Sequence, residues 1–205
     1  MTATPQRRAF WLRHLHRWHW VSASGCLIGM LLFAATGITL NHAGQIEASP
    51  RVTARQAELP AALQAQLAAP RQARAPLPAE VAAWIAGRLD VRVAERAAEW
   101  SDDEVYVGLP RPGGDAWLSI DRTSGEVLYE RTDRGWVSYL NDLHKGRNAG
   151  AAWGWFLDVF ALACFVFCAT GLLLLVLHSG ARPATWPMVT LGLVVPLLLV
   201  LLFIH

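Results

Sequence analysis

The sequence predicts a membrane α+β protein, in which three transmembrane helices accompany a small α+β domain inserted between the first and the second helix. Three observations predict this class. The chain has 205 residues, of which 54% are hydrophobic. The apolar residues gather in three blocks, and a long polar segment separates the first block from the second. Apolar blocks around one polar segment are typical of a membrane protein with one exposed domain.

Each apolar block is long enough to cross a bilayer, because a hydrocarbon core of about 30 Å requires roughly 20 helical residues. Residues 21–40 and 186–204 carry no charge, and residues 153–177 carry only Asp158. A cleaved signal peptide is the alternative for the first block. Its apolar core exceeds the usual length of roughly 7 to 15 residues, so we expect a retained anchor. The predicted helices cover residues 21–42, 151–178 and 186–204.

Basic residues at the ends of these blocks predict the orientation of the chain. Residues 1–20 form a basic amphipathic segment with four arginines and no acidic residue, which places the N-terminus in the cytoplasm. The short loop 179–185 carries Arg182 and is expected on the same side. The polar middle then faces the opposite side, with basic and acidic residues interleaved. This mixture predicts no nucleic-acid-binding surface.

The polar middle is expected to contain one small folded unit. Residues 43–77 show no sustained pattern and are predicted to be a loosely structured linker with a short helix within 59–69. Residues 78–133 then predict an α+β unit. It has a helix after Pro78, strands at 105–109, 116–120 and 126–130, and an ambiguous run at 91–100. Residues 134–150 predict a short interfacial amphipathic helix and a turn before the second span.

Six of the seven histidines lie at the ends of the first two spans, where they could bind haem iron, and His205 is considered incidental. Consecutive spans run antiparallel, so His42 and His144 share one side of the membrane, and His16 or His19 shares the other side with His178. Imidazole is a common axial ligand of haem. No C-x-x-C-H motif is present, so non-covalent haem b is expected. We predict an outer site at His42 and His144 and a weaker inner site. The alternative is that the rings only sit among lipid headgroups.

The first two spans also share short sequences. L-H-R (15–17) and L-H-K (143–145) open them, and A-T-G-I (35–38) and A-T-G-L (169–172) lie near their ends. These shared segments suggest an inverted repeat with two similar sites. Small residues near the histidines could form a flat surface for haem, or they could only let the helices pack closely. The supporting residues predicted here are Thr36, Gly37, Gly150, Gly154, Thr170 and Gly171.

Asp158 and the three cysteines are the remaining polar groups within the spans. A carboxylate inside a membrane is a functional candidate. Asp158 could orient a ligand histidine, or it could form a helix-packing hydrogen bond with Thr36, Thr39 or Asn41. Cys164 and Cys168 share a helix face and could form a Cu(I) site with Cys26 or Met30. The alternative for the cysteines is helix packing.

Several motifs give the chain a family resemblance. The segments D-R-T-S-G-E-V-L, L-N-D-L-H-K-G-R, W-G-W-F-L-D and A-T-G-L resemble the PepSY-associated transmembrane helix family over about residues 14–178. L-H-K-G-R before W-x-W-F-x-D is the most specific of them. The resemblance implies a bacterial inner-membrane protein with a periplasmic PepSY domain. It also implies relatives linked to haem and to reductive release of iron from siderophores.

Three functions from different classes follow. The first is a haem-binding electron-transfer protein of the ferric-reductase type, whose partners would be a ferric siderophore or other iron ligand and a quinone or electron-donor protein. The second is a non-enzymatic PepSY regulator or assembly partner. The third is a subunit of a metal or siderophore importer, which would require a homo-oligomer because three spans are few for a transporter. No catalytic residue is assigned.

Overall fold

The structure is a computed structural model that describes residues 5–46, 49–68, 72–178, 180 and 182–204. The chain divides into two compact units. The first unit consists of Met1–Leu32 with Trp155–His205, and the second of Phe33–Gly154. His205, which we considered incidental, lies outside the described residues.

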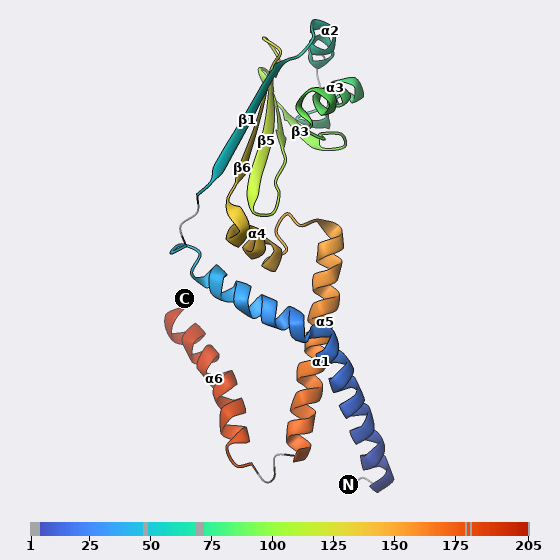
Figure 1. The fold of residues 1–205 in the computed structure, drawn as a ribbon, viewed down its shortest axis with the longest axis vertical. Coiled ribbons are helices and arrows are strands. Elements are labelled where there is room, and N and C mark those ends of the chain that lie inside the picture. The colour runs from blue at the N-terminus through green and yellow to red at the C-terminus, as the bar shows by residue number, and fades with distance from the viewer. Residues whose placement is uncertain (1–4, 47–48, 69–71, 179, 181, 205) are drawn as a thin grey trace. The chain divides into compact units, whose positions relative to one another are not determined.

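Three long helices confirm the three predicted spans (Figure 1). They are α1 (Pro5–Asn41), α5 (Gly150–His178) and α6 (Thr185–Phe203). All three are long and apolar enough to cross a membrane, and most of their large apolar side chains are exposed, which suits contact with a lipid bilayer.

The basic segment 1–20 is not separate from the first span, because α1 begins at Pro5. No glycine or proline interrupts residues 6–24, so nothing in this part of the sequence ends a helix. None of the described residues of α6 is buried.

The polar middle folds as a six-stranded antiparallel sheet in the order β1-β6-β5-β4-β3-β2. The membrane α+β class is therefore confirmed. The three strands predicted with clear patterns are present, and the ambiguous run 91–100 forms a strand only over its last four residues. The bounds are β1 (Arg51–Glu58), β2 (Arg74–Pro76), β3 (Ala97–Trp100), β4 (Glu104–Gly108), β5 (Gly114–Asp121) and β6 (Glu126–Asp133).

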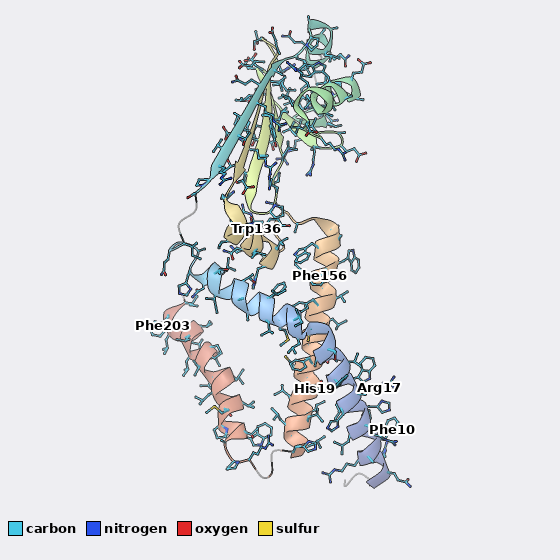
Figure 2. All side chains as sticks on the ribbon, viewed as in Figure 1. Phe10, Arg17, His19, Trp136, Phe156 and Phe203 are labelled. Atoms are coloured by element: carbon cyan, nitrogen blue, oxygen red, sulfur yellow. The ribbon has the colours of Figure 1, made fainter. Side chains whose placement is uncertain are left out.

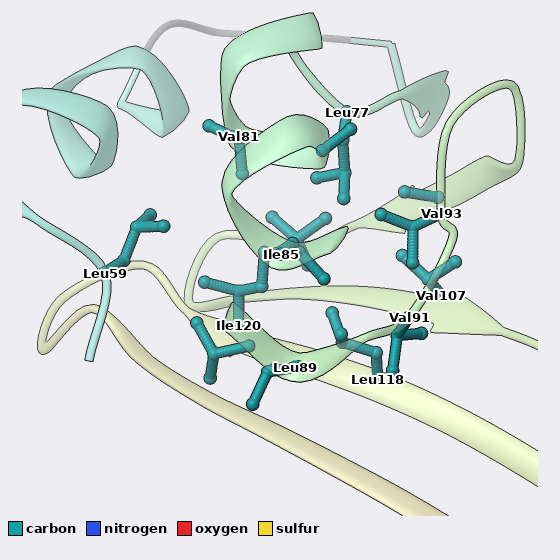
Figure 3. Packing of buried hydrophobic residues seen from close by; sticks show 14 of the residues in the cluster. Leu59, Leu77, Val81, Ile85, Leu89, Val91, Val93, Val107, Leu118 and Ile120 are labelled. Carbon is teal, nitrogen blue, oxygen red and sulfur yellow. The ribbon is translucent and has the colours of Figure 1, made fainter. Parts of the chain in front are cut away.

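Helix α3 (Ala79–Leu89) covers one face of this sheet and forms its core (Figure 3). Val81 and Ile85 are fully buried against Leu118, Ile120 and Val127 of the central strands. The helix begins directly after Pro78, as predicted, because proline fixes the backbone angle that a helix start requires. Burial of these side chains supplies the main stabilisation of the unit.

The prediction that residues 43–77 form a loose linker is wrong. This segment contains β1, the short helix α2 (Ala61–Gln64), the 3-10 turn η1 (Ala65–Leu67) and β2. Nearly every residue of β1 is exposed, so no apolar alternation marks the strand in the sequence. Backbone pairing with β6 over its full length, from Arg51 opposite Asp133 to Glu58 opposite Glu126, holds it in place.

Helix α4 (Gly135–His144) occupies the position predicted for the short amphipathic helix. Its Trp136 side chain is 76% exposed, and Val137 and Leu140 are exposed as well. Trp153 in the first turn of α5 donates its indole N–H to the Leu143 carbonyl at 2.8 Å, so α4 and the start of α5 are tied together. His144 is the last residue of α4.

Candidate histidine sites

His144 packs on the end of α1, inside the second unit. Its Nδ1 atom lies 2.7 Å from the Thr36 hydroxyl oxygen. Its ring lies against Phe33, with 4.8 Å between ring centroids. Gly37 completes the surface, since a Cβ atom added there would be 3.7 Å from the imidazole. The imidazole is thus seated on a phenylalanine, a threonine and a glycine of one helix.

His19 makes the same set of contacts with α5, inside the first unit. It lies on the side of α1 that faces α5 (Figure 2). Its Nδ1 atom is 3.1 Å from the Thr170 hydroxyl oxygen, and its ring stacks on Phe167 with 4.7 Å between centroids. A Cβ atom added to Gly171 would be 3.2 Å from its ring.

The two histidine seats share one sequence motif. F-A-A-T-G-I (33–38) receives His144, and F-C-A-T-G-L (167–172) receives His19. The sequence words A-T-G-I and A-T-G-L suggested an inverted repeat, and these contacts support it. They also change its alignment, because His19, and not the His16 of L-H-R, is the counterpart of His144. The signal that we missed was the phenylalanine three residues before each threonine.

Each threonine of the two seats also bonds to the backbone of its own helix. The Thr36 hydroxyl donates to the Phe33 carbonyl at 3.2 Å, and the Thr170 hydroxyl donates to the Val166 carbonyl at 2.7 Å. The Nδ1 atom of His19 also lies 3.2 Å from the Phe167 carbonyl, which can only accept, so Nδ1–H is the donor at this seat.

His16 and His178 are brought together by α1 and α5, as the inner site predicted. Their ring centroids are 5.9 Å apart and the rings are nearly perpendicular, at 81°. The Nδ1 atom of His16 donates to the Leu12 carbonyl at 2.8 Å, and that of His178 to the Leu174 carbonyl at 2.9 Å. A carbonyl oxygen only accepts, so Nδ1 is the donor in both rings, and in a neutral imidazole with this tautomer Nε2 carries the lone pair. Metal-binding histidines commonly have their other nitrogen held in this way.

The predicted outer pair is arranged differently. His42 is exposed, and its Nδ1 atom donates to the Ile38 carbonyl of its own helix at 3.0 Å. Within the described part of the second unit, its ring makes no contact with the ring of His144. His144 is occupied by Thr36, which lies more than one helical turn before His42. A haem site between His42 and His144 stays a prediction that no contact supports.

The predicted supporting residues divide into two groups. Thr36, Gly37, Thr170 and Gly171 form the histidine seats described above. Gly150 and Gly154 do not mark a close helix approach, because a Cβ atom added at either would meet no described atom within 4 Å. Gly150 instead has a φ of +80° at the start of α5, a backbone conformation that glycine adopts readily. In the first unit, a Cβ atom added to Gly29 would collide with the ring of Phe160.

Asp158 is exposed on α5, and its carboxylate forms no hydrogen bond or ion pair with the described residues of its own unit. The partners considered for it, Thr36, Thr39 and Asn41, belong to the second unit. Both roles considered for Asp158 therefore stay predictions.

The structure brings two of the three cysteines together. Cys26 is buried and forms a side-chain hydrogen bond with Cys164, whereas Cys168 is exposed. Across the described ranges, no group of three or more histidine, cysteine, aspartate or glutamate residues is positioned to hold a metal ion. The contact between Cys26 and Cys164 therefore agrees with the alternative of helix packing.

Comparison with known proteins supports the resemblance seen in the motifs. A family model described as PepSY_TM-like matches residues 10–205, which include all three spans and the sheet domain. No curated protein and no solved structure matches the chain. The match carries no link to siderophore-iron reductases. Because it covers nearly the whole chain, the protein belongs to the PepSY_TM-like family of membrane proteins.

Proposed function

We propose that this membrane protein binds non-covalent haem b and transfers electrons, with His16 and His178 as the axial ligands. The observation that carries the proposal is the 5.9 Å separation of two exposed imidazole rings on two facing helices. Both rings have Nδ1 bound to a backbone carbonyl and Nε2 free. A bis-histidine haem needs only two such ligands, so a cluster of three metal-binding groups is not required.

The chain's own residues have clear roles in this proposal. The Leu12 and Leu174 carbonyls fix the tautomer of the two ligands and limit rotation of their rings. His19, bonded to Thr170, holds α1 against α5 one turn further along and so maintains the spacing of the pair. Haem, when bound, would supply reversible one-electron redox chemistry.

A neighbouring cavity supports a quinone as the electron donor. The first unit contains a cavity of about 470 Å³ between α1 and α5. Its walls are mostly aromatic and aliphatic, with His14 and Thr170 as the polar lining residues. An apolar cavity with few polar groups is the usual form of a site for a small apolar ligand. The cavity lining includes Phe10, Trp11, His14, Leu15, Trp18 and Phe165.

The remaining parts of the proposal rest on the sequence. Four arginines in residues 1–20 and Arg182 after α5 support a cytoplasmic N-terminus, which would place the His16–His178 pair on the cytoplasmic side and the sheet domain in the periplasm. The motif resemblance supports ferric iron or a ferric siderophore as the final acceptor. A second carrier would then have to bring electrons to the periplasmic side.

Haem titration of the purified protein tests the proposal. The full chain in detergent is titrated with hemin, and the Soret band and the dithionite-reduced spectrum are recorded. His16→Ala and His178→Ala are each expected to weaken binding by at least about tenfold. His14→Ala is the matched control, because His14 lies on the same helix but its ring contacts Phe10. Wild-type protein that is correctly folded, with its full helical content, but shows no Soret band would overturn the proposal and favour a non-enzymatic PepSY binding module.

A further inference from the structure

The second unit contains a large cavity that the haem proposal does not use. It has a volume of about 1110 Å³. Its floor is the half of the sheet face that α3 leaves uncovered, where Arg51, Arg55 and Arg131 project from β1 and β6. Its other walls come from α4, the turn after it and the end of α1.

The cavity carries an excess of positive charge. Six of its lining residues are cationic and three are acidic, which leaves an excess of three positive charges. The cationic lining residues are Arg51, Arg55, Arg131, Arg134, Lys145 and Arg147.

Two of the three acidic groups are already satisfied by the protein. Asp133 forms ion pairs with Arg111 at 3.3 Å and with Arg131 at 3.7 Å. The Gly135 amide, followed by Arg111, Arg131 and Arg51, lowers the pKa of Asp133, so this carboxylate is ionised and already compensated. Asp142 accepts the Gly113 amide at 2.9 Å.

Three of the cations remain available to a ligand. Arg134 pairs with Asp115, and Arg55 donates to the Leu89 carbonyl at 2.5 Å. Arg51, Lys145 and Arg147 are exposed, and none of them forms an ion pair with a described residue. Arg51 makes only a longer-range Coulombic interaction with Asp133, the smallest of the causes that affect the pKa of this carboxylate. They come from β1 and from the turn that follows α4, so they approach the cavity from two elements. Such an arrangement suits a multivalent anion, since guanidinium groups bind phosphate oxygens in pairs.

One wall of the same cavity is apolar. Leu40, Ala43 and Ile46 at the end of α1 and Trp136 and Val137 of α4 line it. Leu40 belongs to a helix that is apolar enough to span a membrane, and Trp136 is 76% exposed. Indole rings favour the headgroup region of a bilayer. The cavity therefore joins free cations to an apolar wall at the level expected for lipid headgroups.

We propose that this cavity binds a phosphate-bearing anion through Arg51, Lys145 and Arg147, and that its occupant is the headgroup of an anionic phospholipid. Anionic lipids attract basic residues close to the bilayer, and the apolar wall would contact the glycerol and first acyl carbons. A soluble phosphate ester shares the phosphate but cannot use the apolar wall. The site would couple the sheet domain to the lipid composition of the membrane.

Binding of short-chain lipids to the full chain in detergent tests the proposal. Dioctanoyl phosphatidylglycerol, dioctanoyl phosphatidylcholine and glycerol 1-phosphate are titrated separately, and binding is followed by the quenching or enhancement of tryptophan fluorescence. The variant Arg51→Ala/Lys145→Ala/Arg147→Ala is compared with Arg88→Ala/Arg92→Ala/Arg96→Ala. The control variant loses the same charge from exposed arginines outside the cavity.

Phosphatidylglycerol is expected to bind at least about tenfold more tightly than phosphatidylcholine. The cavity variant is expected to lose this preference, and the control variant to keep it. Glycerol 1-phosphate that binds as tightly as phosphatidylglycerol, and depends on the same three residues, would support the phosphate site with a soluble occupant. Equal binding of both lipids by wild type, or equal losses in the two triple variants, would overturn the proposal.

Discussion

The Nδ1 atom of His144 forms a hydrogen bond with the Thr36 hydroxyl at 2.7 Å, and the ring of His144 packs on Phe33 of the same helix. His19 does the same to Thr170 and Phe167. Each of the two F-x-A-T-G motifs is therefore a seat for one histidine, and both seats are built from a threonine whose own proton is directed to its helix backbone. Through these contacts, α1 binds His144 at the end of α4, and α5 binds His19 of α1.

A double-mutant cycle between His144 and Thr36 is expected to show a favourable coupling. Thr36→Val keeps the shape but removes the hydroxyl, and His144→Phe keeps a ring but removes its nitrogen atoms. Hydrogen bonds between membrane helices average about 0.6 kcal/mol in such cycles, so we expect a coupling of that order in thermal unfolding of the full chain in detergent. The corresponding cycle of His19 with Thr170 should have the same sign. Additive effects at both seats would contradict the assigned hydrogen bonds.

Gly29→Ala is expected to destabilise the first unit by about 1–3 kcal/mol, because overfilling a packed contact forces neighbours to move. An added Cβ atom would collide with the ring of Phe160, which is itself stacked on Phe156. Gly25→Ala is the matched control on the same helix, since its Cβ would meet no described atom within 4 Å. Thermal unfolding should place Gly29→Ala below wild type and Gly25→Ala at or above it. Equal effects would show that α1 and α5 do not approach at Gly29.

Asp121 is expected to stabilise the turn between β5 and β6 only where its carboxylate is ionised. The Ser124 amide and hydroxyl, then the Thr123 amide, lower the pKa of Asp121 below its ordinary value. A lowered folded-state pKa gives stability that is present above about pH 4 and is lost as the pH falls through the folded pKa. Asp121→Asn should therefore increase hydrogen exchange in this turn at pH 7.

Hydrogen exchange at acidic pH provides a comparison with the measurement at pH 7. As the pH falls through the lowered folded-state pKa, the wild-type carboxyl becomes protonated, so the variant and the wild type should differ less there than at neutral pH. Glu126→Gln is the control, because its side chain forms no hydrogen bond with any described residue. A difference between Asp121→Asn and wild type that does not change with pH would contradict the role of the ionised carboxylate.

The sequence predicted those parts of the fold that depend on side-chain pattern. Hydrophobic length alone identified the three spans. Alternation identified β4, β5 and β6, and the spacing of Val81, Ile85 and Leu89 identified α3. Strand β1 was missed because backbone pairing with β6, and not burial, holds it. Such a strand has no alternation of apolar and polar residues that could predict it from the sequence.

The candidate sites were predicted only in part, because sequence patterns place the ends of helices but not the turns between them. Placement at the ends of antiparallel helices grouped His16 or His19 with His178, and the structure has a ring contact between His16 and His178. It could not show that His144 turns toward Thr36 and leaves His42 alone, because that depends on where α4 ends and how the following turn is built. Asn148 and Gly150 have positive φ angles in that turn. The path of the turn, and with it the position of His144, is seen only in the folded chain.

Electron paramagnetic resonance of the ferric, haem-loaded full chain tests the His16–His178 assignment most directly, because the spin state of the iron reports its axial ligands. The account predicts a low-spin signal in wild type and in His14→Ala, and a high-spin signal in both His16→Ala and His178→Ala, since each of these loses one nitrogen ligand. A low-spin signal that survives in both variants, or a correctly folded wild type that takes up no haem, would contradict it.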